Sequence, residues 1–209
     1  MTKLGDQQLG VIAAKPESTA LTPVKKILES DGKTNLVGKD GDTASAKVGD
    51  YVKYELSTVV PNTVGYPEDG FRFYLTDTMD ESLSYVNDEA HPTTVKVNGK
   101  TLTQCTESES NCTGDYYRST QASLGGDPGT NVFFYLDKYV YKASQDIDQV
   151  GKPVTVTYYA KINDKAVKAP QSNDNTVSLD ISKFSGWGTD VIKGNTVKVY
   201  TYDTAFTKV

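Results

Sequence analysis

Apolar and polar residues alternate along two long segments of the chain. In residues 51–60 the apolar row lies at even-numbered positions and consists of Val52, Tyr54, Leu56 and Val60. Residues 154–162 repeat the pattern with Val154, Val156, Tyr158, Ala160 and Ile162. Because successive side chains of a β-strand point to opposite faces, each row marks the buried face of one strand. The two segments therefore predict strands of sheets that pack on a core.

Composition extends this interpretation to the whole chain. Of its 209 residues, 37% are hydrophobic and 14 are tyrosines. Aromatic and β-branched residues favour pleated, half-buried strands over helices. We expect an all-β sandwich with a long surface loop over the polar residues 30–47 and a short helix within residues 137–150.

We expect three parts along the chain. Residues 1–21 lack sustained periodicity and predict a linker, residues 22–198 hold the β-sandwich, and residues 199–209 begin a following domain or linker. The first ten residues lack the apolar core of a signal peptide. We therefore expect a piece of a longer protein whose secretion signal and wall anchor lie elsewhere.

Polar residues continue the apolar row of three further segments. Asp77 follows the row Phe71, Phe73 and Leu75, and Asn175 precedes the row Val177, Leu179 and Ile181. Near the start of the first strand, Lys26 lies between Val24 and Leu28. Because alternate residues of a strand share a face, the pattern predicts that the side chains of Asp77, Asn175 and Lys26 point toward the core.

Inward polar groups need partners, because burying an unpaired charge or amide costs several kcal/mol. One interpretation is a buried hydrogen-bonded cluster, or strand ends at which the rows reach solvent. The other interpretation is covalent. A desolvated lysine loses its proton and becomes a nucleophile, while a desolvated acid keeps its proton and polarises the carboxamide. The amine could then attack the asparagine as the acid shuttles protons, so that ammonia leaves and an isopeptide bond remains.

Four segments in this order resemble the isopeptide-forming domain of Gram-positive pilin backbone subunits. They are VGDYVKYELSTVVPN, FYLTDTMDESLSYV, GKPVTVTYYAKIND and SNDNTVSLDIS, and the resemblance covers most of residues 22–200. It implies an immunoglobulin-like sandwich in which a first-strand lysine is bonded to a late asparagine with the help of an acid. The acid matches Asp77 and the amide matches Asn175.

The lysine has two candidates, because Lys25 and Lys26 are adjacent. The family pattern places an apolar residue two positions before the lysine and another two positions after it. Lys26 meets both conditions through Val24 and Leu28, whereas Lys25 has Pro23 before it. We therefore prefer Lys26 and keep Lys25 as the alternative.

The resemblance also implies a function and partners. It indicates a structural subunit of a cell-wall-anchored surface fimbria, assembled with neighbouring pilin subunits by sortase, in which the cross-link forms once and no substrate is turned over. Lys15 is the candidate sortase lysine, although the usual Tyr-Pro-Lys type of motif is absent. Lys208 would take the lysine position of a following domain. The alternative is a surface adhesin that binds a host protein or glycan, and an accessory carbohydrate-binding module is a third class.

The net charge and the two cysteines limit the binding partners and the cellular compartment that the sequence predicts. The net charge of −5 offers no basic field for nucleic acid, and no run of about 18 apolar residues predicts a membrane span. Cys105 and Cys112 could close a small loop as a disulfide in an oxidising compartment. With His91 as the only histidine, the sequence predicts no metal site and no hydrolase triad, and it indicates no cofactor.

Overall fold

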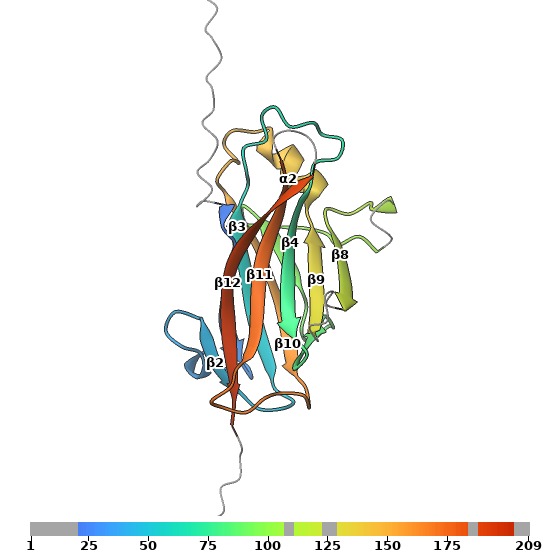
Figure 1. Ribbon diagram of the computed structural model, residues 1–209. Coiled ribbons are helices and arrows are strands. Elements are labelled where there is room, and N and C mark those ends of the chain that lie inside the picture. Colours follow the sequence, from blue (N-terminus) through green and yellow to red (C-terminus); the bar gives the residue numbers. More distant parts are fainter. Residues whose placement is uncertain (1–20, 107–110, 123–128, 184–187, 203–209) are drawn as a thin grey trace, which may run out of the picture.

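Two six-stranded sheets pack face to face in the computed structural model, which describes residues 21–106, 111–122, 129–183 and 188–202 (Figure 1). The first sheet has the order β1 (Val24–Ser30), β3 (Tyr51–Val59), β10 (Pro153–Ile162), β6 (Thr94–Val97) and β7 (Lys100–Thr101), and β5 (Leu83–Val86) also pairs with β10. The second has the order β2 (Thr43–Ala46), β12 (Thr189–Thr201), β11 (Asn173–Ser182), β4 (Phe73–Asp80), β9 (Gly129–Tyr135) and β8 (Tyr117–Ala122). The predicted all-β, immunoglobulin-like sandwich is confirmed.

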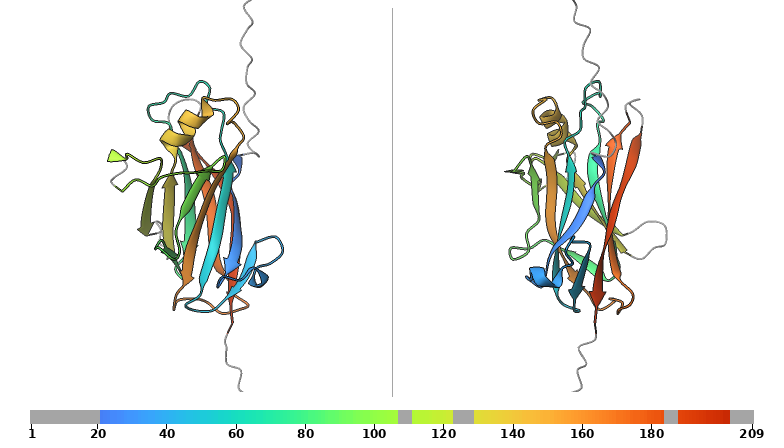
Figure 2. Two further views of the ribbon diagram at one scale, coloured as in Figure 1. Left: turned by 180° about the vertical axis from the view of Figure 1, so that it is seen from behind. Right: turned by 90° about the vertical axis from the view of Figure 1, so that its left-hand side faces the viewer.

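Figure 2 shows the two sheets edge-on as two layers, and the buried apolar side chains form the core between them. Both long apolar rows of the first sheet, in residues 51–60 and 154–162, point into it and are almost fully buried. Their strands are direct neighbours, with Tyr54 opposite Tyr158 in an antiparallel register. Burial of each large apolar side chain contributes about 1.5–3 kcal/mol, so this alternation holds the two layers together.

The segment 30–47 differs from the predicted loop. It contains a short 3₁₀ helix, η1 (Thr34–Leu36), and then β2, which pairs in parallel with β12. Ala44 and Ala46 are buried, and they form the apolar row of this strand. Two alanines in a polar stretch rich in glycine and aspartate are too weak a signal to predict an edge strand.

The predicted helix is present as α2 (Asp137–Ser144), and turns follow it to residue 151. The last strand continues beyond the predicted boundary at residue 198, because β12 runs to Thr201 and Val199 is fully buried. Residues 1–20 and 203–209, which include Lys15 and Lys208, lie outside the described residues.

The first and last described segments leave the sandwich at opposite ends. The described chain begins toward the end that carries α2, and β12 finishes at the other end (Figure 1). Within the described ranges, no helix has the length and apolar character needed to cross a membrane.

Candidate cross-linking site

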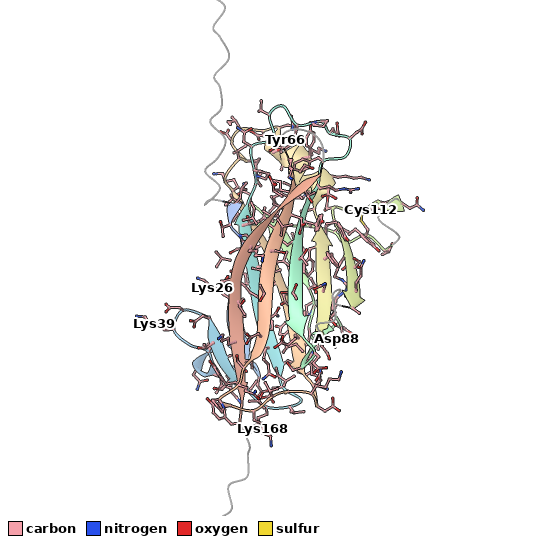
Figure 3. All side chains as sticks on the ribbon, in the orientation of Figure 1. Lys26, Lys39, Tyr66, Asp88, Cys112 and Lys168 are labelled. Atoms are coloured by element: carbon pink, nitrogen blue, oxygen red, sulfur yellow. A yellow bond between two sulfur atoms is a disulfide. The ribbon has the colours of Figure 1, made fainter. Side chains whose placement is uncertain are left out.

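Lys25, and not Lys26, is the lysine that the first strand directs into the core. The Lys25 side chain is 0% exposed, whereas Lys26 is exposed at the outer surface (Figure 3). The inward row of this strand is Lys25 and Ile27, and Val24 is 41% exposed. The preference for Lys26 is therefore wrong, because the row that contained Val24 faces outward.

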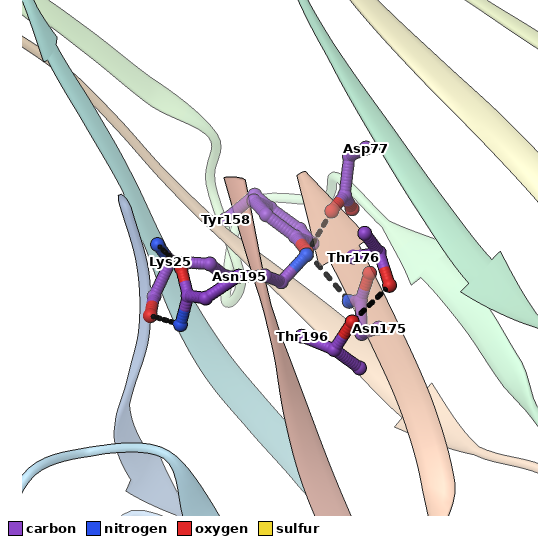
Figure 4. A network of polar contacts seen from close by, with 7 residues as sticks. All are labelled: Lys25, Asp77, Tyr158, Asn175, Thr176, Asn195 and Thr196. Carbon is purple, nitrogen blue, oxygen red and sulfur yellow. Dashed lines mark hydrogen bonds and ion pairs between the residues drawn. The ribbon is translucent and has the colours of Figure 1, made fainter. Parts of the chain in front are cut away.

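The backbone at Lys25 is attached to the opposite sheet. The Asn195 side chain of β12 accepts a hydrogen bond from the Lys25 amide nitrogen at 2.7 Å and donates one to the Lys25 carbonyl oxygen at 2.9 Å (Figure 4). The adjacent Gly194 allows this approach, since a Cβ there would collide with the Pro23 carbonyl oxygen and the Val177 side chain. Asn195 thus fixes the depth at which the lysine enters the core.

Asp77 and Asn175 lie where their apolar rows place them, on adjacent strands of the second sheet. Both side chains are 0% exposed. Asp77 of β4 pairs with Val177 of β11, two residues from Asn175. The Lys25 amine reaches across the core from the first sheet and donates a hydrogen bond to Asp77 Oδ1 (Figure 4). The structure therefore brings the predicted acid and amide together with the alternative lysine.

A fourth polar group, the Tyr158 hydroxyl, completes the cluster. Its oxygen accepts a hydrogen bond from Lys25 Nζ at 2.9 Å and another from Asn175 Nδ2 at 2.9 Å. Tyr158 belongs to the apolar row of β10 and is fully buried. Alternation alone predicts a core residue at this position, and the only sign of a polar role is the phenolic oxygen, which is the one polar side-chain atom in that row.

Desolvation dominates the electrostatics of this cluster. Burial lowers the pKa of Lys25 well below its ordinary value, which favours the neutral amine. Burial also raises the pKa of Tyr158 well above its ordinary value, so the hydroxyl keeps its proton. Among the side chains of Lys25, Asp77, Asn175 and Tyr158, two buried oxygens have no hydrogen-bond partner, Asp77 Oδ2 and Asn175 Oδ1. If Asp77 is protonated, these two atoms are a complementary donor and acceptor.

The arrangement supplies what amide exchange requires. A neutral amine is a nucleophile, a carboxamide carbon is an electrophile, and a carboxylic acid can polarise the carbonyl and move protons. All three groups lie in a dry core, where such interactions are stronger than in water.

The two cysteines lie apart from this cluster. Cys105 and Cys112 form a disulfide beside β8, and Cys112 is at the side of the sandwich (Figure 3). In the part of the chain that the structure describes, no group of three or more His, Cys, Asp or Glu could hold a metal ion.

Solved structures share this fold. A C-terminal fragment of the major pilin GBS80 of Streptococcus agalactiae superimposes with a TM-score of 0.58 at 15% identity, covering 87% of this chain and 56% of that chain. A backbone pilin of Streptococcus pyogenes gives 0.53 at 18% identity, covering 85% and 36%. The N-terminal domain of the Streptococcus gordonii adhesin Sgo0707 gives 0.50 at 20% identity, covering 86% and 32%.

These similarities establish that the chain has the fold of Gram-positive pilin domains. The chain spans about half or less of the length of these three solved chains. No protein-family model matches the sequence, and the search of curated proteins found no match.

Proposed function

We propose that this domain is a structural module of a Gram-positive surface pilus and that it is cross-linked internally by an isopeptide bond between Lys25 Nζ and Asn175 Cγ. The observation that carries the proposal is the fully buried cluster of Lys25, Asp77 and Asn175. Burying a charged lysine and an acid in a β-sandwich core carries a desolvation penalty, so a cluster that served only as an ion pair would lower the stability of the fold. The fold shared with pilin domains supports the same conclusion.

In the proposed reaction, Lys25 starts as the neutral amine that burial favours and Asp77 starts as the protonated acid. The neutral Lys25 amine attacks Asn175 Cγ, and protonated Asp77 donates a hydrogen bond to Asn175 Oδ1 as negative charge develops there. The bond from Cγ to Nδ2 then breaks. Nδ2 leaves as ammonia after it gains one proton from the lysine nitrogen, through Asp77 as the shuttle. One amide, one released ammonia and an unchanged Asp77 are the products, so the reaction happens once and nothing is turned over.

The position of the bond suits a protein under tension. Lys25 is on β1 at an edge of one sheet, and Asn175 is on β11 inside the other sheet. The bond would join the two layers and tie the first strand to the next-to-last strand. Because the described chain enters and leaves at opposite ends of the sandwich, a pulling force would act along the strands (Figure 1). Because the bond would join a residue near the start of the domain to one near its end, the strands between Lys25 and Asn175 could not be pulled out.

In this proposal the protein is extracellular and its partners are neighbouring pilin subunits. Sortase would join these subunits, with Lys15 as the candidate lysine, and attach the fibre to the cell wall. A disulfide between Cys105 and Cys112 is consistent with an oxidising environment.

Intact-mass spectrometry of the denatured, disulfide-reduced protein tests the proposal. We expect a mass lower than that of the encoded chain by one ammonia. Lys25→Ala, Asp77→Ala and Asn175→Ala should each restore the encoded mass, whereas the matched control Lys26→Ala should keep the deficit. An encoded mass for the unaltered, folded protein would refute the cross-link.

A second candidate function, a surface adhesin for a glycan or host protein, is favoured by one feature of the outer surface. Four aromatic rings of the second sheet form a continuous cluster, with centroid separations of 5.1 to 6.2 Å; they are Tyr74, Tyr117, Phe133 and Tyr135. Partly exposed tyrosines are common at binding surfaces. A glycan array and a host-protein pull-down test this candidate. Saturable binding that Tyr135→Ala abolishes would support it, and the absence of binding would leave the structural role alone.

A further inference from the structure

Tyr158 occupies a position that the proposed reaction of Lys25 with Asn175 does not yet use. Its oxygen is within 2.9 Å of Lys25 Nζ, the attacking nitrogen, and within 2.9 Å of Asn175 Nδ2, the leaving nitrogen. Both nitrogens donate to this one oxygen, and Figure 4 shows the side chains of Lys25, Tyr158 and Asn175 converging at this point. No other described residue hydrogen-bonds to both reacting side chains.

We propose that Tyr158 is a catalytic residue of isopeptide formation, whose hydroxyl oxygen holds the attacking and leaving nitrogens together in one geometry. This inference rests on the proposed function. It adds a fourth reacting-site residue to the lysine, the acid and the asparagine.

The lysine needs two acceptors to present its lone pair. A neutral amine has two N–H bonds and one lone pair. One N–H is directed to Asp77 Oδ1 and the other to Tyr158 Oη. With both N–H bonds engaged, the remaining direction on the nitrogen is the lone pair, which is the part that must attack. Without the phenol, one N–H would have no acceptor in a fully buried site, and the amine could rotate.

The asparagine is held by the same oxygen. Its Nδ2 donates to Tyr158, and its Oδ1 has no partner among the described residues, so that this oxygen is available to protonated Asp77. Orienting two reactants in this way matters because a misplacement of about 1 Å costs roughly 100-fold in rate.

The tyrosine ring is itself fixed. It stacks on Tyr54 with centroids 5.4 Å apart and contacts Tyr85 at 5.8 Å and Phe134 at 6.2 Å. Tyr158 is fully buried, and β10 is hydrogen-bonded on both sides. The hydroxyl can therefore act as a rigid holding point rather than a mobile group.

Tyr158→Phe removes the hydroxyl and keeps the ring, so it is the variant that tests the inference. The matched control is Tyr85→Phe, because Tyr85 packs on the same ring but its hydroxyl bonds to Thr93. Each protein is made in a short pulse of cell-free synthesis, synthesis is stopped, and samples are denatured at intervals. Intact mass then gives the fraction that has lost ammonia, and protease resistance before denaturation gives the fraction folded.

We expect the unaltered protein and Tyr85→Phe to lose ammonia as they fold. Tyr158→Phe should fold on the same timescale but lose ammonia roughly 100-fold more slowly. Equal rates in all three proteins would overturn the role of Tyr158 and leave the proposed cross-link intact. Absence of ammonia loss in the unaltered protein would instead overturn the cross-link and this inference with it.

A second measurement does not depend on how Tyr158→Phe folds. Asp77→Asn keeps the shape of the acid but cannot supply its proton, so the bond should not form. A crystal structure of that variant should show the Tyr158 hydroxyl within hydrogen-bonding distance of both Lys25 Nζ and Asn175 Nδ2. A hydroxyl turned away from either nitrogen would contradict the inference.

Discussion

Replacing Lys25 with methionine should remove a large part of the stability of this domain. A bond between residues 25 and 175 closes a loop of about 150 residues, and the chain-entropy relation gives such a loop about 5 kcal/mol of stabilisation. Lys25→Met keeps an unbranched side chain of similar length without leaving a buried amine. The loss of Asp77's partner adds a further cost of about 1–3 kcal/mol. The free energy of unfolding should therefore fall by at least about 5 kcal/mol.

Thermal unfolding followed by calorimetry measures this loss. For a domain of this size, about 1 kcal/mol corresponds to a change in Tm of roughly 2–4 °C, so we expect a decrease of about 10–20 °C. Lys26→Met is the matched control, because Lys26 is the exposed neighbour on the same strand, and its Tm should stay within about 2 °C of the unaltered value. A decrease below about 4 °C for Lys25→Met, or equal decreases for both variants, would refute the reasoning.

Three further outcomes are expected. Gly194→Ala should push the first strand away from β12 and slow ammonia loss by roughly 100-fold in the pulse assay. Gly99→Ala also strains the backbone, because Gly99 has a φ of +79°, but it puts no atom near the added Cβ and should leave the rate of ammonia loss in the folded protein unchanged. In the Asp77→Asn protein, which should stay unreacted, burial holds the pKa of Lys25 below its ordinary value of 10.5. As the pH falls, Lys25 therefore binds a proton in the unfolded chain before it does so in the folded protein, and this favours unfolding. Urea titrations should therefore show stability rising with pH up to about pH 9, by at most about 1.4 kcal/mol per pH unit, and adding Lys25→Met should abolish that slope. Reduction of the Cys105–Cys112 disulfide should add two hydrogens to the intact mass and lower the free energy of unfolding by about 2 kcal/mol, as urea titration with and without reductant would show.

The sequence predicted the site best where the strands are long and regular. Asp77 and Asn175 each continue a row of at least three apolar residues, and a period of two leaves no doubt about the face on which the next residue lies. Both side chains are fully buried, as their rows require. The same rule located the core faces of β3 and β10.

The same rule failed for the first strand because the inward row of this strand is short and contains a buried lysine. Lys25 replaces an apolar residue on the inward face, which leaves only Ile27 to mark that face, while Val24 lies on the outward face. A shift in register between Ile27 and Glu29 further weakens the alternation. A lysine on the buried face thus leads the alternation pattern to assign the wrong face of this strand to the core.

Two parts of the site depend on tertiary contacts that alternation does not record. Asn195 binds the backbone of a strand 170 residues earlier in the chain, and nothing in its own segment indicates that partner. Tyr158 contributes through one phenolic oxygen at the end of a ring that otherwise packs like any core residue. Their contacts with Lys25 become evident only from the packing of the two sheets in the folded structure.

Tandem mass spectrometry of a proteolytic digest tests the central claim most directly. After reduction and digestion, we expect a branched peptide in which the side chain of Lys25 is joined to that of Asn175 with the loss of one ammonia. Fragment ions should assign the junction to Lys25 rather than to Lys26. Recovery of the two segments as separate, unmodified peptides, or a junction at Lys26, would contradict the account.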